Sequence, residues 1–268
     1  MLDKDQFLKE NNLFAEFHKS GLDWAVLDSI AQQHENNRKE YYKRIALDHV
    51  DTIMKFKHVH SVRYRVKETE SLIEKIIRKT NEGEPNINVD TYRTKITDLI
   101  GIRILYVFKS DYYPIHEQIV KVYEKKFVER RPQINLRTGD DRNLYNKIRD
   151  PIINENKVYR SIHYTMLAHE NDSDSPRIEI QTRTIFEEGW SEINHKLVYK
   201  KGNSAGNLLL QKTSDILNAL SGDCDTLGEL MLKIYSELCQ DNKNQGASPE
   251  NDLQSDAIQG IMKEIIKM

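Results

Sequence analysis

The stretch PRIEIQTRT (residues 176–184) alternates polar and apolar residues, and this alternation decides which kind of fold the chain adopts. Successive side chains of a β-strand point to opposite faces of the sheet, so a period of two predicts a strand with two unlike faces. The isoleucines of the stretch fill a core on one side. Its polar residues share the other side: Arg177, Glu179, Gln181 and Arg183. Such a face is either solvent-exposed or the floor of a site, and the stretch alone leaves both interpretations open.

Other segments with a period of two, or with continuous apolar character, predict further strands. They are HVHSVRYRV (58–66), LIGIRILYVF (99–108), KFVERRPQI (126–134) and SIHYTMLAH (161–169). Helical periodicity is typical of residues 1–57 and of four later segments. These are residues 68–79, 113–126, 186–200 and 207–238, the last with a break expected near Gly222. Residues 135–157 are polar without a clear period and are predicted to form a long loop, and a short helix is expected to close the chain.

The order of these elements predicts an α+β fold, with a mixed β-sheet of about five strands flanked by helices. The corresponding domain division is an N-terminal helical extension (1–57), a central sheet domain (58–200) and a C-terminal helical extension (201–268). The helices of the two extensions are expected either to cover the sheet or to join copies of the chain into a homo-oligomer.

The composition excludes several classes of protein. Forty basic residues nearly cancel 42 acidic ones in the 268-residue chain, which argues against a general nucleic-acid coat but permits a local basic pocket. The two cysteines, Cys224 and Cys239, cannot form a zinc site alone and are interpreted as buried or idle thiols. The sequence lacks both a signal-peptide pattern and an apolar run of about 18 residues, so a cytoplasmic protein without membrane contact is expected.

A basic cluster lies where the first predicted strand meets the following helix. Its members are Arg63, Arg65, Lys67, Ser71 and Lys75. Alternate strand residues share a face, and helical residues four apart also share a face, so these side chains are expected to converge on polyphosphate near a helix N-terminus. An ordinary basic edge is the alternative, because three glutamates are interspersed among them.

Two further positions carry chemistry beside predicted strands. Asp98 comes just before the apolar run at 99–108, where its carboxylate can hold Mg²⁺ bound to phosphates or simply cap a turn. Tyr159 offers an aromatic face on which a base can stack, and His163 offers a hydrogen-bond donor. The alternative is that Tyr159 and Tyr164 are half-buried aromatic residues of a strand.

The helix predicted at 186–200 has one polar stripe, which either is its wet face or rims the same pocket. The stripe consists of Glu188, Glu192, His195 and Tyr199. Its other side is expected to pack in the core through Trp190, Ile193 and Leu197.

Four of these segments, taken in order, resemble the synthetase domain of the RelA/SpoT family over roughly residues 58–200. RVKETESLIEK (65–75) resembles the family pattern G-R-x-K-x-x-x-S-x-x-x-K, except that Tyr64 stands in place of its glycine. TDLIGIRI (97–104) resembles D-x-x-G-x-R. YRSIHY (159–164) resembles Y-x-S-I-H. The most specific is RIEIQTRTIFEEGWSEINHKLVYK (177–200), which is similar to the E-I-Q-x-R-T motif and the helix that follows it.

This resemblance implies a (p)ppGpp synthetase that transfers the pyrophosphoryl group of ATP to the 3′-hydroxyl of GDP or GTP, with Mg²⁺ as cofactor. Asp98 and Glu179 would hold the metal, and Glu179 would help to deprotonate the hydroxyl. The ATP-binding residues implied are Arg65, Lys67, Ser71, Lys75 and Arg103. The residues implied around the acceptor nucleotide are Tyr159, His163, Gln181, Arg183, His195 and Lys200.

The sequence departs from the family pattern around the acceptor nucleotide. Val158 stands where a glycine usually precedes the tyrosine, and the other acceptor motifs are not recognisable in residues 135–158. Two alternatives therefore stay open. One is a family member that modifies the 3′ end of tRNA or an adenosine nucleotide, with Lys196, Lys200, Lys201 and Lys212 as RNA contacts. The other is a nucleotide-binding module without turnover.

Overall fold

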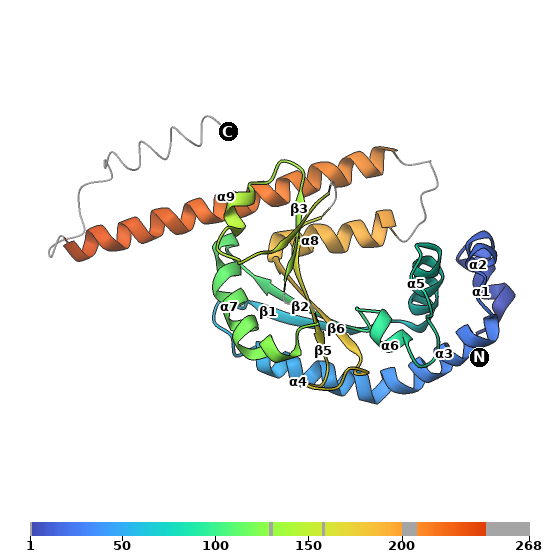
Figure 1. The fold of residues 1–268 in the computed structure, drawn as a ribbon. Coiled ribbons are helices and arrows are strands. Elements are labelled where there is room, and N and C mark those ends of the chain that lie inside the picture. Colours follow the sequence, from blue (N-terminus) through green and yellow to red (C-terminus); the bar gives the residue numbers. More distant parts are fainter. Residues whose placement is uncertain (1, 129–130, 157–158, 200–207, 245–268) are drawn as a thin grey trace.

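A six-stranded mixed sheet forms the centre of the computed structural model, which describes residues 2–128, 131–156, 159–199 and 208–244 (Figure 1). The strand order is β1-β2-β6-β5-β3-β4, with β2–β6 and β3–β4 parallel and the other neighbours antiparallel. The strands are β1 Ser61–Val66, β2 Ile100–Tyr106, β3 Gln133–Arg137, β4 Ile152–Asn156, β5 Ser161–Leu167 and β6 Arg177–Thr184. Helices lie on both sides of the sheet, so the predicted α+β class is confirmed.

Nine α-helices are described in these residue ranges, and short 3₁₀ or π-helical turns join some of them. They are α1 Lys4–Glu10, α2 Phe14–Ser20, α3 Trp24–Asn37, α4 Lys43–Ile53, α5 Thr69–Asn81, α6 Tyr92–Lys95, α7 Tyr112–Tyr123, α8 Ile185–Asn194 and α9 Leu208–Asn244. In the described part of the chain, no helix has both the length and the apolar character needed to cross a membrane.

Three predicted elements differ from the structure. The prediction of a long loop at 135–157 is wrong, because this range contains the end of β3 and the edge strand β4. The sequence of β4, IINEN, does not alternate apolar and polar residues, so it carries no strand pattern. The strand predicted over 126–134 begins only at Gln133, after Pro132, which has no N–H to donate to a sheet. Helix α9 continues through Gly222 without a break. A Cβ at Gly222 would lie 3.0 Å from the Arg160 guanidinium, so this glycine permits close packing.

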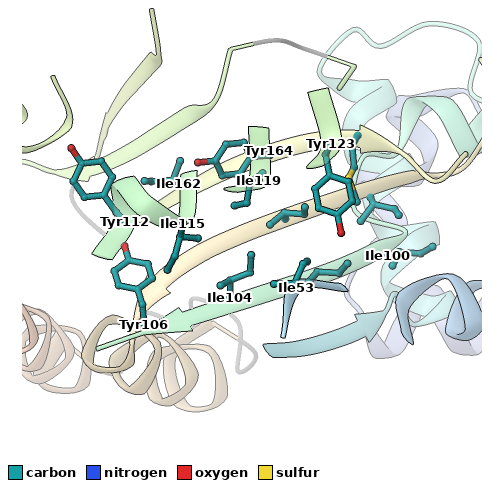
Figure 2. Packing of buried hydrophobic residues seen from close by; sticks show 14 of the residues in the cluster. Ile53, Ile100, Ile104, Tyr106, Tyr112, Ile115, Ile119, Tyr123, Ile162 and Tyr164 are labelled. Atoms are coloured by element: carbon teal, nitrogen blue, oxygen red, sulfur yellow. The ribbon is translucent and has the colours of Figure 1, made fainter. Parts of the chain in front are cut away.

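Helices α4 and α7 cover one face of the sheet with an apolar core (Figure 2). The even-numbered residues of β2, such as Ile100 and Ile104, meet Ile53 of α4 and Ile115 and Ile119 of α7 in this cluster. These side chains are at most 5% exposed, so this face carries much of the burial that stabilises the fold.

A second apolar cluster joins the N-terminal helices to α5. It contains Leu27 and Ile30 of α3 together with Leu72, Ile73 and Ile76 of α5, all fully buried. Helix α5 is thereby fixed beside the end of β1, with its other side free to carry charge. The predicted closing helix lies outside the described residues, and the predicted domain boundaries stay a prediction.

Candidate active site

The sheet face opposite the α4–α7 core is lined by polar side chains. The strand register sets Arg65 of β1, Gly101 of β2 and Glu179 of β6 in one row across three strands. The next row contains Arg63, Arg103, Gln181 and His163. The prediction that the polar residues of 176–184 share one face, with isoleucines buried behind them, is confirmed.

Asp98 is the centre of charge at one end of this face. Its Oδ2 lies 2.9 Å from Lys67 Nζ, and its Oδ1 lies 2.9 Å from Lys75 Nζ. Arg65 Nη2 is 3.9 Å from Oδ2. Only 7% of Asp98 is exposed, so a single buried carboxylate faces three cations, contributed by β1, by α5 and by the segment between them. Of the five residues predicted to converge, Arg65, Lys67 and Lys75 meet at Asp98. Arg63 instead lies 3.9 Å from Glu188.

Burial and ion pairing act against each other in this cluster. Burial alone would raise the pKa of Asp98, but the charges and hydrogen bonds of Lys67 and Lys75 lower it to about 2. Burial lowers the pKa of Lys67, and Asp98 opposes that shift. Asp98 is therefore ionised at neutral pH, and its carboxylate offsets cationic repulsion that would otherwise destabilise the pocket.

Gly101 lets Arg65 lie flat across the sheet. A Cβ at this position would lie 3.2 Å from Arg65 Cγ and 3.3 Å from its Nε, which is closer than nearly all Cβ contacts. Gly101 is the register partner of both Arg65 and Glu179, so the Arg65 side chain packs over the strand that lies between them. The glycine thus joins the basic end of the face to Glu179, on the same side as Asp98.

Glu179 belongs to a chain of polar contacts that runs along β6 and β5. Its Oε2 accepts a hydrogen bond of 2.5 Å from Gln181 Nε2, and its Oε1 lies 3.6 Å from His163 Nδ1. His163 Nε2 is in turn 2.5 Å from Ser161 Oγ. Burial lowers the pKa of His163 despite the nearby carboxylate, so its imidazole is neutral at pH 7.

Tyr159 lies at the edge of this polar chain. Its ring stacks on His163, with centroids 6.2 Å apart and planes at 28°. The hydroxyl points to Asn135 Oδ1 at 3.4 Å, and Asn156 holds the backbone N–H and C=O of Tyr159. Tyr159 is only half-buried, so it provides an aromatic surface on a fixed support.

A cluster of arginines lies at the opposite end of the face, and it depends on Glu188 of α8. Arg103 Nη1 is 2.9 Å from Glu188 Oε1, and Arg183 Nη1 is 3.3 Å from its Oε2. Arg63 Nη1 lies 3.9 Å from Glu188 Oε1. Arg103 Nη1 also donates to Glu192 Oε1 at 2.6 Å. Glu188 is 4% exposed, so it anchors these guanidinium groups from inside the protein.

This arrangement corrects the prediction for α8. Ile193 and Leu197, expected in the core, are each 46% exposed, whereas Glu188, expected on the stripe, is buried. Trp190 is buried as predicted. The physical reason is that α8 covers the polar face of the sheet. The side of α8 that faces the sheet therefore carries the carboxylate that pairs with the arginines, and its apolar residues Ile193 and Leu197 are left exposed.

The start of α8 is fixed by a capping box that sequence reasoning missed. Thr184 Oγ1 accepts from Glu187 N at 3.1 Å, and Glu187 accepts from Thr184 N at 2.9 Å. Thr184 also donates to Asp225 of α9 at 3.1 Å, and Lys109 contacts Glu187. The Thr-x-x-Glu spacing in the sequence was a readable signal for this cap.

The remaining predicted residues are less engaged. Ser71 is exposed on α5, one turn before Lys75, and Arg177 donates to the Ser175 carbonyl at 3.3 Å. His195 begins the π-helical turn His195–Tyr199 after α8. Lys196 and Lys212 are exposed on the surface, and Lys200 and Lys201 lie outside the described residues.

The comparison with protein families identifies the family of the chain. The sequence model of the family described as "Region found in RelA / SpoT proteins" matches residues 64–204, which is more than half of the 268-residue chain. The chain belongs to the RelA/SpoT family. The RelA/SpoT region runs from Tyr64 in β1 past the end of α8, and so contains both ends of the charged face.

Individual relatives share between 22% and 28% sequence identity with this RelA/SpoT-family protein. GTP pyrophosphokinase YwaC from Bacillus subtilis (strain 168) is 28% identical over 186 residues, which cover 67% of this chain and 75% of that protein. Small alarmone synthetase 2 from Bacillus subtilis is 26% identical, with a TM-score of 0.48 over 73% of this chain and 95% of that one. A GTP pyrophosphokinase family protein from Streptococcus pneumoniae is 22% identical, with a TM-score of 0.49 over 81% and 96%.

The Asp98 cluster predicts an acid-dependent loss of stability. Because the native pKa of Asp98 is below its ordinary value of 3.8, its contribution is complete above about pH 4 and is lost as the pH falls through about 2. Between pH 5 and pH 2, the free energy of unfolding of the wild type is expected to fall by about 2 kcal/mol more than that of Asp98→Asn. Urea unfolding followed by tryptophan fluorescence at several pH values measures this difference.

The control for this experiment is Asp90→Asn, which changes an exposed aspartate. Its unfolding curve is expected to follow the wild type at every pH. If the curves of Asp98→Asn and the wild type ran parallel from pH 5 to pH 2, the ion pairing assigned to Asp98 would be wrong.

The two glutamates that contact Arg103 form a matched pair for a second prediction. Glu188→Gln leaves buried arginines without their shared carboxylate and is expected to lower the free energy of unfolding by about 3 kcal/mol. Glu192→Gln changes a side chain that is 36% exposed, and a loss below about 1 kcal/mol is expected. Equal losses in the two variants, measured by urea unfolding at pH 7, would refute the anchoring role of Glu188.

Proposed function

We propose that this RelA/SpoT-family protein is a GTP pyrophosphokinase that transfers the β,γ-diphosphate of ATP to the 3′-hydroxyl of GDP or GTP and makes (p)ppGpp. The observation that carries the proposal is the row of Arg65, Gly101 and Glu179, beside Asp98 held between Lys67 and Lys75. The name of the relative YwaC, a GTP pyrophosphokinase, supports the same reaction.

ATP is proposed to bind at the basic end of the face. The residues assigned to it are Arg65, Lys67, Ser71, Lys75 and Arg103. Lys67 and Lys75 already point to a common anion, the Asp98 carboxylate, and phosphate oxygens are the natural second partner of the same ammonium groups. The exposed hydroxyl of Ser71 lies one helical turn away from Lys75 and can donate to the same phosphates.

The donor set at this end fits Mg²⁺. Asp98 is ionised at neutral pH, and Asp98 and Glu179 offer the hard oxygen atoms that this ion prefers. We assign Asp98 and Glu179 as its protein ligands, with ATP phosphates completing the shell. When bound, the ion would neutralise phosphate charge and polarise the β-phosphoryl group.

The acceptor nucleotide is proposed to lie over β5 and β6. Tyr159 stacks on the base, His163 and Gln181 hydrogen-bond to the nucleotide, and Arg183 contributes positive charge from below. His195 and Lys200 are assigned to the same side. The neutral imidazole of His163 suits a hydrogen-bonding role without net charge.

The proposed reaction is an in-line displacement. The 3′-hydroxyl oxygen attacks the β-phosphorus of ATP, and the bond from that phosphorus to the oxygen bridging it to the α-phosphorus breaks, so that AMP leaves. Glu179 accepts the hydroxyl proton, and Gln181 Nε2, which donates to Glu179, fixes the orientation of that carboxylate. Arg65 and the lysines stabilise charge on the transferred group.

Glu179→Gln tests this assignment. With ATP, Mg²⁺ and GTP or GDP, the wild type is expected to release AMP and form penta- or tetraphosphate, whereas the variant loses about 100-fold or more of that rate because it can neither accept the proton nor bind the metal as an anion. Chromatographic separation of labelled nucleotides gives both products.

Glu170→Gln, an exposed change in the β5–β6 turn, is the control and is expected to retain the wild-type rate. An unchanged rate in Glu179→Gln would contradict the role of this residue. Absence of AMP release by the wild type with any guanosine acceptor would contradict the proposed reaction itself.

A further inference from the structure

The backbone of Lys67 is held by a buried histidine of helix α3. Strand β1 ends at Val66, so the polar backbone groups of Lys67 need partners beyond the regular strand. The N–H of Lys67 donates to the Leu99 carbonyl at 2.9 Å, and His34 Nε2 lies 2.8 Å from the Lys67 carbonyl oxygen. Both polar groups of this backbone are therefore fixed, and the side chain extends from them to Asp98.

The surroundings of His34 define which of its nitrogens carries the hydrogen. A carbonyl oxygen only accepts hydrogen bonds, so Nε2 carries the hydrogen and donates to Lys67. Within the described part of the chain, His34 Nδ1 is buried without a hydrogen-bond partner. Burial lowers the pKa of His34, so its ring is neutral at pH 7. The one N–H of the ring is thus used in the bond to the Lys67 carbonyl.

Two tyrosines fix the orientation of the His34 ring. Its centroid lies 5.6 Å from that of Tyr42, in the π-helical turn Arg38–Tyr42, and 6.4 Å from that of Tyr92 in α6. All three side chains are fully buried, and the two tyrosine hydroxyls are 3.4 Å apart. Because protein interiors are close-packed, the His34 ring cannot rotate away from the Lys67 carbonyl without displacing a tyrosine.

Helix α3 and the turn after it also hold the two residues that follow Lys67. Thr69 Oγ1 donates to Glu35 Oε2 at 2.7 Å, and Arg38 Nη2 pairs with Glu68 Oε1 at 2.5 Å. Glu68 is the N-cap residue of α5, but within the described residues its side chain makes no capping hydrogen bond. The connection from β1 to α5 (residues 67–69) is therefore held by α3, which lies beside α5 (Figure 1).

These contacts determine where the ammonium group of Lys67 lies. A lysine carries a point charge on a flexible stem, so the position of the charge depends on its partner and on where the backbone is anchored. Asp98 is the partner, 2.9 Å from Nζ, and His34 is the anchor. When phosphate oxygens compete with Asp98 for the ammonium group, the anchor is unchanged.

We propose that His34 is a positioning residue for ATP, because its hydrogen bond to the Lys67 carbonyl holds the Lys67 ammonium group at the phosphates. This inference rests on the proposed function, which makes ATP the ligand of Lys67. His34 is fully buried, so it acts through Lys67 and does not contact the nucleotide itself. The competing interpretation is a histidine that only fills the core, and its effect would not pass through Lys67.

Isothermal titration calorimetry of the purified full chain with Mg²⁺ and α,β-methylene-ATP tests the proposal. This analogue has a methylene group at the bond that breaks, and its binding needs no acceptor. His34→Leu removes the N–H and is expected to weaken binding about tenfold. His34→Gln, whose amide reaches the same carbonyl, is expected to stay within about twofold of the wild type. His34→Asn, whose amide is too short to reach it, is expected to behave as His34→Leu does.

A double variant shows whether the effect passes through the lysine. Lys67→Met removes the ammonium group and is expected to weaken binding on its own. Adding His34→Leu to Lys67→Met is expected to cause no further loss, since the group that His34 positions is already absent. A histidine with a purely structural role would instead multiply the two losses.

His49→Leu is the matched control. His49 is also a buried histidine of the N-terminal helices, and its Nδ1 lies 3.2 Å from the Tyr123 hydroxyl, on the side of the sheet opposite the charged face. The variant is expected to unfold at a lower temperature than the wild type but to bind the analogue equally well. Circular dichroism shows that each variant is folded, and His34→Asn replaces His34→Leu throughout if the leucine variant does not fold.

The possible failures are distinguishable. If the wild type binds the analogue and His34→Leu binds it equally well, the positioning role is wrong. The same follows if the losses of His34→Leu and Lys67→Met multiply, if His34→Gln binds as weakly as His34→Leu, or if His49→Leu loses as much affinity. A wild type that does not bind the analogue would overturn the assignment of ATP, and with it both the proposed function and the role of His34.

Discussion

One buried carboxylate organises the charged half of this protein. The Asp98 carboxylate forms ion pairs at 2.9 Å with Lys67 Nζ and with Lys75 Nζ, and Arg65 Nη2 lies 3.9 Å from it. Three cations held so close together repel one another, and the anion between them offsets that repulsion. The cluster also explains the local architecture. Strand β1, helix α5 and the segment between them contribute the cations, and the turn before β2 contributes the anion. The strand–helix junction therefore surrounds a site for negative charge.

The sheet separates this charge from the core. Behind the polar face, the isoleucines of β2 and β6 pack on α4 and α7, which gives the charged side chains a rigid base. At the other end of the face, Glu188 forms ion pairs with Arg103 and Arg183, and so offsets their repulsion as Asp98 offsets that of the lysines. A surface on which Asp98 and Glu188 already hold the cations in place is preorganised for an anionic ligand.

Much of this was readable from the sequence, and the exceptions share a cause. The alternation in 176–184 predicted which side chains share a face, because the period of a strand is a local property. The RxKxxxSxxxK spacing likewise placed Lys67 and Lys75 together. The burial of Glu188 was not predictable in this way, since it depends on how α8 is rotated against arginines from distant strands. Gly222 was misread as a helix break because its partner, Arg160, is 62 positions away in the chain, and β4 was missed because an exposed edge strand has no apolar pattern.

The central claim is that the Asp98 carboxylate occupies the place of the ATP phosphates on Lys67 and Lys75. A crystal structure with a non-hydrolysable ATP analogue and Mg²⁺ tests it most directly. The account predicts phosphate oxygens within hydrogen-bonding distance of both ammonium groups, and one metal ion bound by Asp98 and Glu179. A nucleotide bound elsewhere, with Asp98 still bridging the two lysines, would contradict it.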